Sequence, residues 1–130
     1  MIAQGPGKSG SAGSIVLISS TSSMTGSNNL VAYGASKGGV DQLCRQLAVE
    51  WGPHAIRVNA VNPGYTRNDM VGTEARHAAS GLNEEIKRMT PLGRRGTVAE
   101  IAGPVVFLAS DAASYISGVC LAVDGGYCAF

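Results

Sequence analysis

Apolar positions along the chain fall into two kinds of pattern. Three aliphatic runs, at residues 14–19, 56–61 and 119–123, are short and bounded by glycine, proline or polar residues, which predicts buried strands. Apolar residues recur at helical spacing over residues 40–51, and a Thr-x-x-Glu capping box predicts a second helix over residues 97–109. Helical crossovers between short aliphatic strands imply a parallel sheet, so the sequence predicts an α/β fold.

The sequence also predicts which side chains of the helices are buried and how the long connection behaves. In the first helix, apolar positions such as Leu43 are predicted to face the core, and Asp41 is expected with the other polar residues on the solvent face. Pro104 lacks a backbone donor and should kink the second helix. Residues 65–95 are mostly polar, with weak helical character around residues 84–89, and are predicted to form a mobile excursion from the sheet.

Composition narrows the class of protein. The chain has 130 residues, enough for one compact domain, and a formal net charge of +1. This balance, without a basic stripe, predicts that it binds neither nucleic acid nor a membrane surface. The longest apolar stretch, residues 101–109, is too short to span a bilayer. The cysteines are odd in number and lack metal-ligand spacing, which favours free thiols, no metal and a reducing, cytoplasmic location. They are Cys44, Cys120 and Cys128.

A glycine-rich segment precedes the first predicted strand. Gly5-Pro-Gly7-Lys-Ser-Gly10 matches the GxGxxG pattern, but that motif needs a strand before it and a helix after it, so that the helix amino terminus faces a pyrophosphate. Here a strand follows instead, and Leu30 stands where a ribose-binding acid would be needed. Residues 1–13 are therefore predicted to be a flexible connection.

Ser20, Tyr33 and Lys37 are the candidate chemical groups. Tyr33 and Lys37 are one helical turn apart, so their side chains leave the same face of a helix. A free tyrosine titrates at about 10, and an ammonium held nearby favours its phenolate form, so the pair could act as a general acid and base. Ser20 lies at the carboxyl end of a strand, where a hydroxyl can donate to a substrate carbonyl. Taken alone, the Tyr-x-x-x-Lys spacing also fits an exposed surface pair.

A series of short motifs gives these three residues a context. Ile18-Ser19-Ser20 is followed, 13 positions after Ser20, by Tyr33-Gly34-Ala35-Ser36-Lys37-Gly38-Gly39. Three further motifs follow in order: Ile56-Arg57-Val58-Asn59-Ala60-Val61-Asn62-Pro63-Gly64, Phe107-Leu108-Ala109-Ser110-Asp111 and Val123-Asp124-Gly125-Gly126. The series resembles the short-chain dehydrogenase/reductase family over nearly the whole chain beyond Gly13. The implied fold is a partial Rossmann-like doubly wound parallel sheet, comprising the last three strands and their helices over residues 14–130.

The resemblance implies a role for each of the three residues. Tyr33 would be the proton donor and acceptor. Lys37 would favour the phenolate and hydrogen-bond the nicotinamide ribose, so that Tyr33 and Lys37 would both be catalytic and both contact the cofactor. Ser20 would orient and polarise the substrate carbonyl.

The resemblance also implies cofactor contacts and a lid. Pro63 and Gly64 match the turn beside the nicotinamide, and Thr66 falls where the family uses a backbone group to hold the carboxamide. Residues 65–95 match the variable lid that selects substrate. The family's TGxxxGxG loop, its cofactor selector and its catalytic asparagine have no counterpart here, and Asn68 replaces a usual threonine. The cofactor therefore stays open between NAD and NADP, with NADP slightly preferred.

Two functions remain as alternatives. The resemblance implies an NAD(P)-dependent oxidoreductase that interconverts a secondary alcohol and a ketone, acts on a small molecule and forms homo-oligomers at full length. The 130-residue chain alone would be weakly active or inactive. The alternative is a non-catalytic fragment that acts as an interaction module, because the strand over residues 14–19 would offer a long apolar edge.

Overall fold

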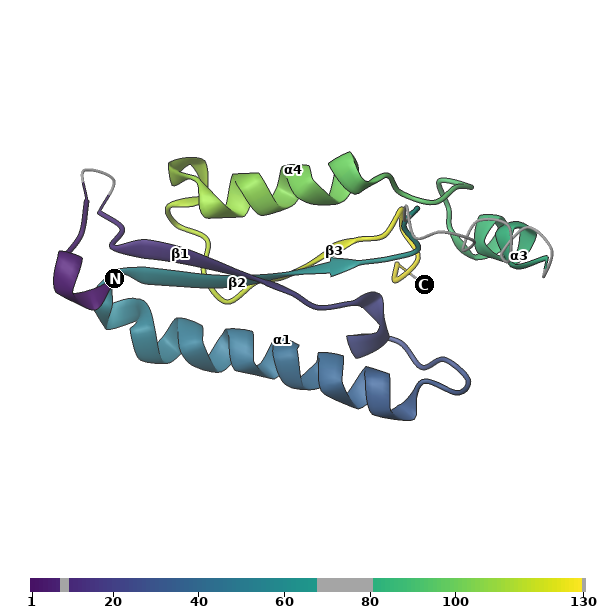
Figure 1. The fold of residues 1–130 in the computed structure, drawn as a ribbon, viewed down its shortest axis with the longest axis horizontal. Coiled ribbons are helices and arrows are strands. Elements are labelled where there is room, and N and C mark those ends of the chain that lie inside the picture. The colour runs from purple at the N-terminus through teal and green to yellow at the C-terminus, as the bar shows by residue number, and fades with distance from the viewer. Residues whose placement is uncertain (8–9, 68–80, 130) are drawn as a thin grey trace.

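Three parallel strands form a sheet in which β2 lies between β1 and β3 (Figure 1). The computed structural model describes residues 1–7, 10–67 and 81–129. Its strands are β1 (Gly13–Ile18), β2 (Ile56–Pro63) and β3 (Cys120–Val123). β1 pairs with β2 over its whole length, and β3 pairs with the carboxyl half of β2. The central strand β2 is accordingly buried almost throughout.

Two long helices cover opposite faces of this sheet (Figure 1). α1 (Val31–Trp51) follows β1, and α4 (Val98–Ala109) precedes β3. α3 (Leu82–Met89) lies beyond the carboxyl ends of the strands (Figure 1). Short 3-10 turns are η1 (Ile2–Gln4), η2 (Thr21–Ser23), η3 (Gly52–His54) and η4 (Asp111–Ala113). The result is a helix–sheet–helix sandwich with α3 and η2 gathered at one end.

Side chains alternate between the two faces of β2, and this alternation divides the core. The buried members are Cys44, Ile56, Val58 and Ala60 on the α1 side and Val61, Leu108 and Ala113 on the α4 side. Even-numbered positions of β2 therefore meet α1, and odd-numbered positions meet α4. By this rule Asn62 faces the α1 layer and Arg57 faces the α4 layer.

The predicted α/β class, the three strands and the two main helices are confirmed. Each strand begins within one residue of its predicted start, and β2 continues to Pro63. The helical character around residues 84–89 corresponds to α3. α1 begins at Val31, well before the apolar pattern at residue 40. The pattern misses this start because residues 34–39 are glycine, alanine, serine and one lysine, which form no apolar stripe.

The capping box at the start of α4 is also confirmed. The Thr97 hydroxyl accepts a hydrogen bond from the Glu100 amide at 3.2 Å, and the Glu100 carboxylate accepts one from the Thr97 amide at 2.8 Å. The helix then runs through Pro104 to Ala109 as one element. The missing Pro104 amide removes one bond of the helical ladder without ending the helix.

The solvent-face prediction for Asp41 is wrong. Asp41 is 3% exposed, whereas Leu43, predicted to face the core, is 48% exposed. The buried face of α1 follows Asp41 and Cys44, which are three residues apart and so lie on one side of the helix. The Asp41 carboxylate accepts hydrogen bonds from Ser23 and Asn62, which compensate for its burial.

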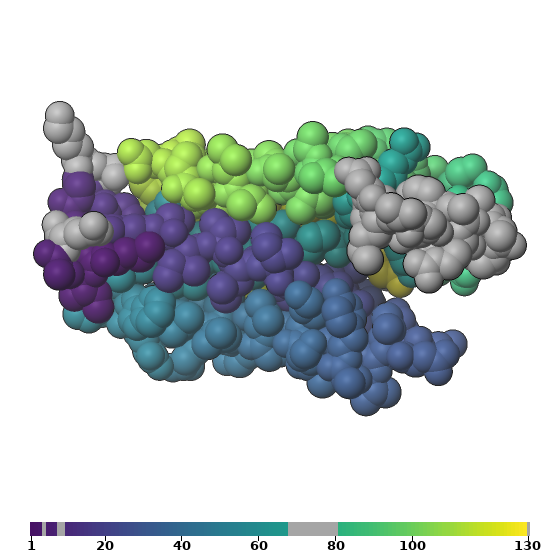
Figure 2. All heavy atoms as spheres, in the orientation of Figure 1, coloured from purple at the N-terminus to yellow at the C-terminus, as the bar shows by residue number. Residues whose placement is uncertain are grey.

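β1 forms one edge of the sheet. In the part of the chain that the structure describes, its only strand partner is β2. Figure 2 shows the atoms of β1 open to view in a band between α4 and α1. Ile18, the last residue of the strand, is 50% exposed. This agrees with the open apolar edge that the sequence predicts.

Membrane-spanning and metal-binding features are absent from the described residues. No helix there is both long enough and apolar enough to cross a membrane. Nor do histidine, cysteine, aspartate and glutamate side chains gather there in a group that could hold a metal ion.

The three cysteines are free thiols. Burial, and then the neighbouring Cys120, raises the pKa of Cys44 to about 12. Burial, and then Asp124, raises the pKa of Cys128 to about 11. Both side chains therefore stay protonated at neutral pH and pack as small apolar groups.

Candidate active site

Small and polar residues follow the carboxyl end of each strand. Ser20 comes two residues after β1, Gly64 directly after β2 and Asp124 directly after β3. In a parallel sheet these ends share one edge, where ligands of open α/β sheets bind. A Cβ at Gly64 would lie only 2.7 Å from the Asp124 Cβ, so glycine is what allows the two strand ends to approach this closely.

Ser20 caps the turn η2. Its Oγ accepts a hydrogen bond from the Ser22 amide at 3.1 Å. Because the oxygen is the acceptor in this bond, its hydroxyl hydrogen can be donated to another group. Gly34 of α1 lies against this turn, since a Cβ there would come within 3.2 Å of the Ser22 carbonyl oxygen. The amino end of α1 therefore packs directly on the turn that carries Ser20.

Tyr33 and Lys37 share one face at the amino end of α1. Lys37 Nζ lies 5.8 Å from the centroid of the Tyr33 ring and donates a hydrogen bond to the Ile18 carbonyl at 3.0 Å. The Ser19 hydroxyl donates to the Lys37 carbonyl at 3.1 Å. These bonds fasten α1 to the end of β1. Tyr33 is 45% exposed, so its phenol is open to a ligand.

Two adjoining hollows open at this edge of the sheet. The smaller, of about 140 Å³, has Ser20, Pro63 and Gly64 in its wall. The larger, of about 650 Å³, is bounded in part by Glu85 and Met89 of α3. Both are lined by Ser27, Leu30, Tyr65 and Tyr127. A ligand in the larger hollow would therefore reach the smaller one beside Ser20.

Tyr65 and Tyr127 form the wall shared by the two hollows. Their rings meet edge to face, with centroids 5.5 Å apart and planes at 88°. Burial, and then Tyr127, raises the pKa of Tyr65, so its hydroxyl remains a donor at neutral pH. The segment after β3 thus contributes the Tyr127 side chain to the wall of both hollows.

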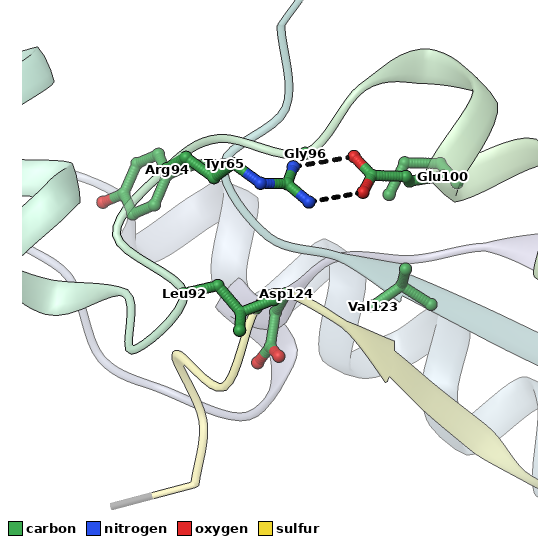
Figure 3. Close-up of a pocket in the computed structure, with 9 residues that line it drawn as sticks. Tyr65, Leu92, Arg94, Gly96, Glu100, Val123 and Asp124 are labelled. Atoms are coloured by element: carbon green, nitrogen blue, oxygen red, sulfur yellow. Dashed lines mark hydrogen bonds and ion pairs between the residues drawn. The ribbon is translucent and has the colours of Figure 1, made fainter.

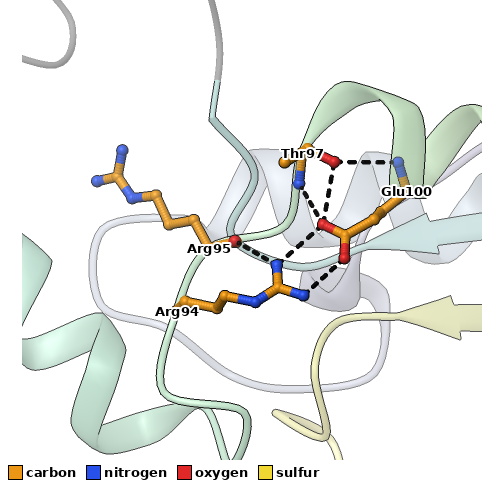
Figure 4. A network of polar contacts seen from close by, with 4 residues as sticks. All are labelled: Arg94, Arg95, Thr97 and Glu100. Atoms are coloured by element: carbon orange, nitrogen blue, oxygen red, sulfur yellow. Dashed lines mark hydrogen bonds and ion pairs between the residues drawn. The ribbon is translucent and has the colours of Figure 1, made fainter.

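A third hollow, of about 120 Å³, lies between the segment after α3 and the start of α4 (Figure 3). In its wall the Arg94 guanidinium donates two hydrogen bonds to the Glu100 carboxylate, at 2.9 and 2.6 Å. Arg94, followed by the amide and hydroxyl of Thr97, lowers the pKa of Glu100 to about 2 (Figure 4). Because these charges already satisfy each other, we assign them to holding the start of α4.

Thr66 lies just beyond the Gly64 turn in an isolated parallel bridge with Gly96. The Arg67 amide donates to the Gly96 carbonyl at 2.9 Å, and the Gly96 amide donates to the Tyr65 carbonyl at 3.0 Å. Since the bridge uses the residues that flank Thr66, the amide and carbonyl of Thr66 itself face away from Gly96.

The structure brings the predicted site residues to one edge of the sheet. They are Ser20, Tyr33, Lys37, Pro63, Gly64 and Thr66. Asn68 and residues 68–80 of the predicted lid lie outside the described residues.

Sequence reasoning missed a polar group beside Ser20, formed by half-buried Ser23 with buried Asp41 and Asn62. A signal for Asp41 was present, because it follows Lys37 by four residues and so shares the helix face of that lysine. It also missed Tyr127, for which the sequence offers no local signal.

Known proteins are similar to this chain over most of its length. A family model described as enoyl-(acyl carrier protein) reductase matches residues 3–128. Galactitol 2-dehydrogenase (L-tagatose-forming) from Cereibacter sphaeroides is 51% identical over 96 residues, which cover 74% of this chain and 37% of that protein. The 2-dehydro-3-deoxy-D-gluconate 5-dehydrogenase of Escherichia coli K12 is 41% identical over 128 residues, or 98% of this chain and 48% of that protein. The chain spans less than half the length of these curated relatives.

Solved structures match over the same region. A Beutenbergia cavernae protein described as an NAD(P)-dependent gluconate 5-dehydrogenase, crystallised with bound NADP at low occupancy, has a TM-score of 0.86 at 45% identity. The match covers 100% of this chain and 49% of that chain. An Agrobacterium tumefaciens protein described as a 2-deoxy-D-gluconate 3-dehydrogenase, with bound NADP, has a TM-score of 0.85 at 42% identity, over 95% of this chain and 49% of that one. These matches confirm the partial Rossmann-like, doubly wound fold.

Proposed function

The chain belongs to the short-chain dehydrogenase/reductase family, and on that premise we propose that it is the catalytic, carboxyl-terminal half of an NAD(P)-dependent oxidoreductase that interconverts a secondary alcohol and a ketone. Residues 14–130 form that half of the domain, with a flexible connection at residues 1–13 and a substrate lid at about residues 65–95. The observation that carries the proposal is the Lys37 ammonium 5.8 Å from the Tyr33 ring, on a helix packed against the turn of Ser20.

Ser20 and Tyr33 act on the same substrate oxygen in this proposal. When bound, the reduced cofactor NAD(P)H would supply hydride to the carbonyl carbon and leave as NAD(P)+. The Tyr33 hydroxyl gives its proton to the carbonyl oxygen, and the Lys37 ammonium stabilises the phenolate that remains. The Ser20 hydroxyl donates a hydrogen bond to the same oxygen, because the Ser22 amide occupies the acceptor side of Ser20 Oγ. In the direction of oxidation the same protons move in reverse.

The cofactor and substrate are proposed from the same edge of the sheet. Lys37 would meet the nicotinamide ribose, and Pro63, Gly64 and the Thr66 backbone would hold the nicotinamide ring. Both solved relatives described above carry NADP, which supports NAD(P) and a slight preference for NADP. Their names and those of the curated relatives support a polyhydroxylated substrate such as a sugar, sugar acid or polyol. We further propose a cytoplasmic enzyme that forms homo-oligomers at full length.

Removing the Tyr33 hydroxyl tests the proposal. The test uses the proposed full-length enzyme, called the longer enzyme below. There Tyr33→Phe should lower kcat by at least about 100-fold, the lower end of what a positioned acid/base supplies. The Kd for NAD(P)H should change by less than about twofold. Steady-state kinetics and nicotinamide fluorescence measure the two effects. A variant that keeps its turnover would remove Tyr33 from proton transfer and defeat the proposed mechanism.

A non-catalytic interaction module is the second candidate. The observation that favours it is the open edge of β1, whose backbone groups could pair with a strand of another chain (Figure 2). Titration of the 130-residue chain with NAD(P)H separates the two candidates. A Kd in the low micromolar range, about −8 kcal/mol, would count against an inert module. We expect little binding by this chain alone, because its described residues meet only the nicotinamide end of the cofactor.

A further inference from the structure

A polar cluster of two buried side chains and one half-buried side chain lies beside Ser20. It consists of Ser23, Asp41 and Asn62, and is named the Asp41 cluster here. We infer that the Asp41 cluster is a positioning device for catalysis, which fixes the Ser20 hydroxyl relative to Tyr33. The inference rests on the proposed function, since it concerns the same site.

Hydrogen bonds join the three side chains to each other. The Ser23 hydroxyl lies 2.6 Å from Asp41 Oδ2, and Asn62 Nδ2 lies 3.0 and 2.9 Å from the two Asp41 oxygens. Asn62 Nδ2 also lies 2.8 Å from Ser23 Oγ. The Asn62 amide and the Ser23 hydroxyl supply all the hydrogens, and the Asp41 carboxylate only accepts. The single Ser23 hydroxyl hydrogen has two acceptors at 2.6 Å, Asp41 Oδ2 and the Ser20 carbonyl oxygen, so Ser23 links these two groups.

The same donors reach the backbone of Ser20. Its carbonyl oxygen is approached by the Ser23 hydroxyl at 2.6 Å, by the Ser23 amide at 3.0 Å and by Asn62 Nδ2 at 3.2 Å. Holding this carbonyl fixes the orientation of the peptide plane after Ser20, and with it the direction of the Cα–Cβ bond. The cluster thereby restrains the backbone of Ser20, while the Ser22 amide restrains its Oγ.

Asp41 connects this arrangement to the other two reactive residues. It follows Lys37 by four positions and Tyr33 by eight, so the three side chains share one face of α1. The acid/base pair and the acceptor of the cluster are thus carried by one rigid helix. Any shift of η2 relative to α1 would have to break the hydrogen bond between Ser23 and Asp41.

The energetics of the cluster favour a positioning role over a purely stabilising one. Asp41 is 3% exposed and Asn62 is fully buried, yet among the described residues no Lys, Arg or His nitrogen lies within ion-pair distance of Asp41. The Asn62 amide oxygen also has no hydrogen-bond partner among the described residues. Burying a carboxylate and an unpaired acceptor is unfavourable, and an apolar contact at the same place would stabilise the fold at least as well. What an apolar contact could not supply is the set of donors that holds the Ser20 carbonyl.

Paired substitutions in the longer enzyme test the inference. Ser23→Ala removes the hydroxyl shared by Asp41 and Ser20, and Ser23→Thr restores a hydroxyl at the same position. Ser14→Ala is the matched control, because the Ser14 hydroxyl makes a comparable bond to the Leu108 carbonyl at 2.9 Å near the opposite end of β1. Steady-state kinetics, nicotinamide binding and thermal unfolding are measured for all variants.

Ser23→Ala should lower kcat by between about 10- and 100-fold, as expected for a small misplacement of a reacting group, with KM for the cofactor changed by less than about threefold. Ser23→Thr should recover most of the loss, and Ser14→Ala should keep wild-type kcat. Asp41→Asn, which replaces an acceptor by a donor, should lower kcat in the same way as Ser23→Ala.

Three outcomes would overturn the inference. They are a wild-type kcat in Ser23→Ala, an equal loss of kcat in Ser14→Ala, or a loss fully explained by a smaller folded fraction that binds cofactor. If Asp41→Asn does not fold, the Ser23 pair decides the question alone. Tyr33→Phe separates this test from the proposed function. If that variant is inactive while Ser23→Ala is normal, only the positioning inference fails, whereas an active Tyr33→Phe removes both.

Discussion

Arg57 lies near the amino end of β2, at the opposite end of the sheet from Ser20, and is only 6% exposed. Its guanidinium donates hydrogen bonds to three carbonyl oxygens, those of Leu108 at 2.9 Å, Ser110 at 3.0 Å and Ile116 at 3.3 Å. These bonds tie the end of α4 and the approach to β3 onto the central strand. Arg57→Met removes all three bonds and keeps most of the buried stem.

The expected loss of stability depends on whether the three carbonyl oxygens keep another hydrogen-bond donor. Each keeps one other donor: the Ser14 hydroxyl for Leu108, the Ala113 amide for Ser110 and the Asn59 amide group for Ile116. Because no carbonyl is left without a donor, each lost bond should be worth about 1 kcal/mol, and the three together about 3 kcal/mol. In a domain of about 150–250 residues this corresponds to a fall in Tm of roughly 6–12 °C. Relief of guanidinium desolvation makes these values upper bounds.

Denaturant unfolding and kinetics of the longer enzyme carry the test. Arg57→Met should lower the free energy of unfolding by between about 1 and 3 kcal/mol, while kcat, measured well below Tm, stays within about twofold of the wild type. Arg57→Lys keeps the charge on a less extended donor and should fall between the two. A loss under about 1 kcal/mol would refute the view that these bonds hold α4 to the sheet. A collapse of kcat in a folded variant would refute the separation between the two ends of the sheet.

Three further predictions concern an ion pair, two glycines and a buried thiol. The pKa of Glu100 is lowered from its ordinary value of 4.5 to about 2 by Arg94, so its stabilising effect is complete above pH 4.5 and is lost as pH falls through about 2. The difference in Tm between wild type and Glu100→Gln should therefore shrink over that range, and a constant difference would contradict the ion pair. Gly125 has φ +66°, and a Cβ there would lie 2.7 Å from a neighbouring methyl, so Gly125→Ala should destabilise by about 2 kcal/mol or more on denaturant unfolding. Gly39→Ala in α1 meets nothing within 4 Å and should instead stabilise by roughly 0.5–1 kcal/mol; equal effects of the two would refute the steric argument. Cys44, with its pKa raised to about 12, should resist iodoacetamide at neutral pH until the protein unfolds, and rapid alkylation of the native protein would show that α1 opens.

The parts of the fold that the sequence predicts well are those with local causes. A short aliphatic run between turn residues specifies a buried strand, and Thr97 with Glu100 specifies a helix start through bonds between near neighbours. The beginning of α1 has no such cause. Its first turns contain Gly34, Gly38 and Gly39, which leave no apolar stripe, and the close fit of Gly34 against Ser22 is visible only in three dimensions.

The site residues also differ in whether a local sequence pattern predicts them. The spacing of Tyr33 and Lys37 predicts a shared helix face, and the structure places the two side chains together. Asp41 was assigned to the solvent because a charged residue in an amphipathic pattern is normally exposed. The groups that compensate its burial, Ser23 and Asn62, are separated from it by 18 and 21 residues. A pattern read along one helix carries no information about donors so distant in the chain.

The helices α1 and α4 therefore differ in how directly their packing affects the proposed reaction. One face of α1 changes from reactive at Tyr33 and Lys37 to polar and buried at Asp41, and then to apolar at Cys44, which packs in the core against β2. Because a helix moves as a rigid body, a change in packing at Cys44 also moves Tyr33. α4 packs on the opposite face of the sheet, and within the described ranges it is connected to the site through the segments that flank it. Activity should thus depend on core packing on the α1 side and be largely independent of it on the Arg57 side, which is the asymmetry that the Arg57 experiment measures.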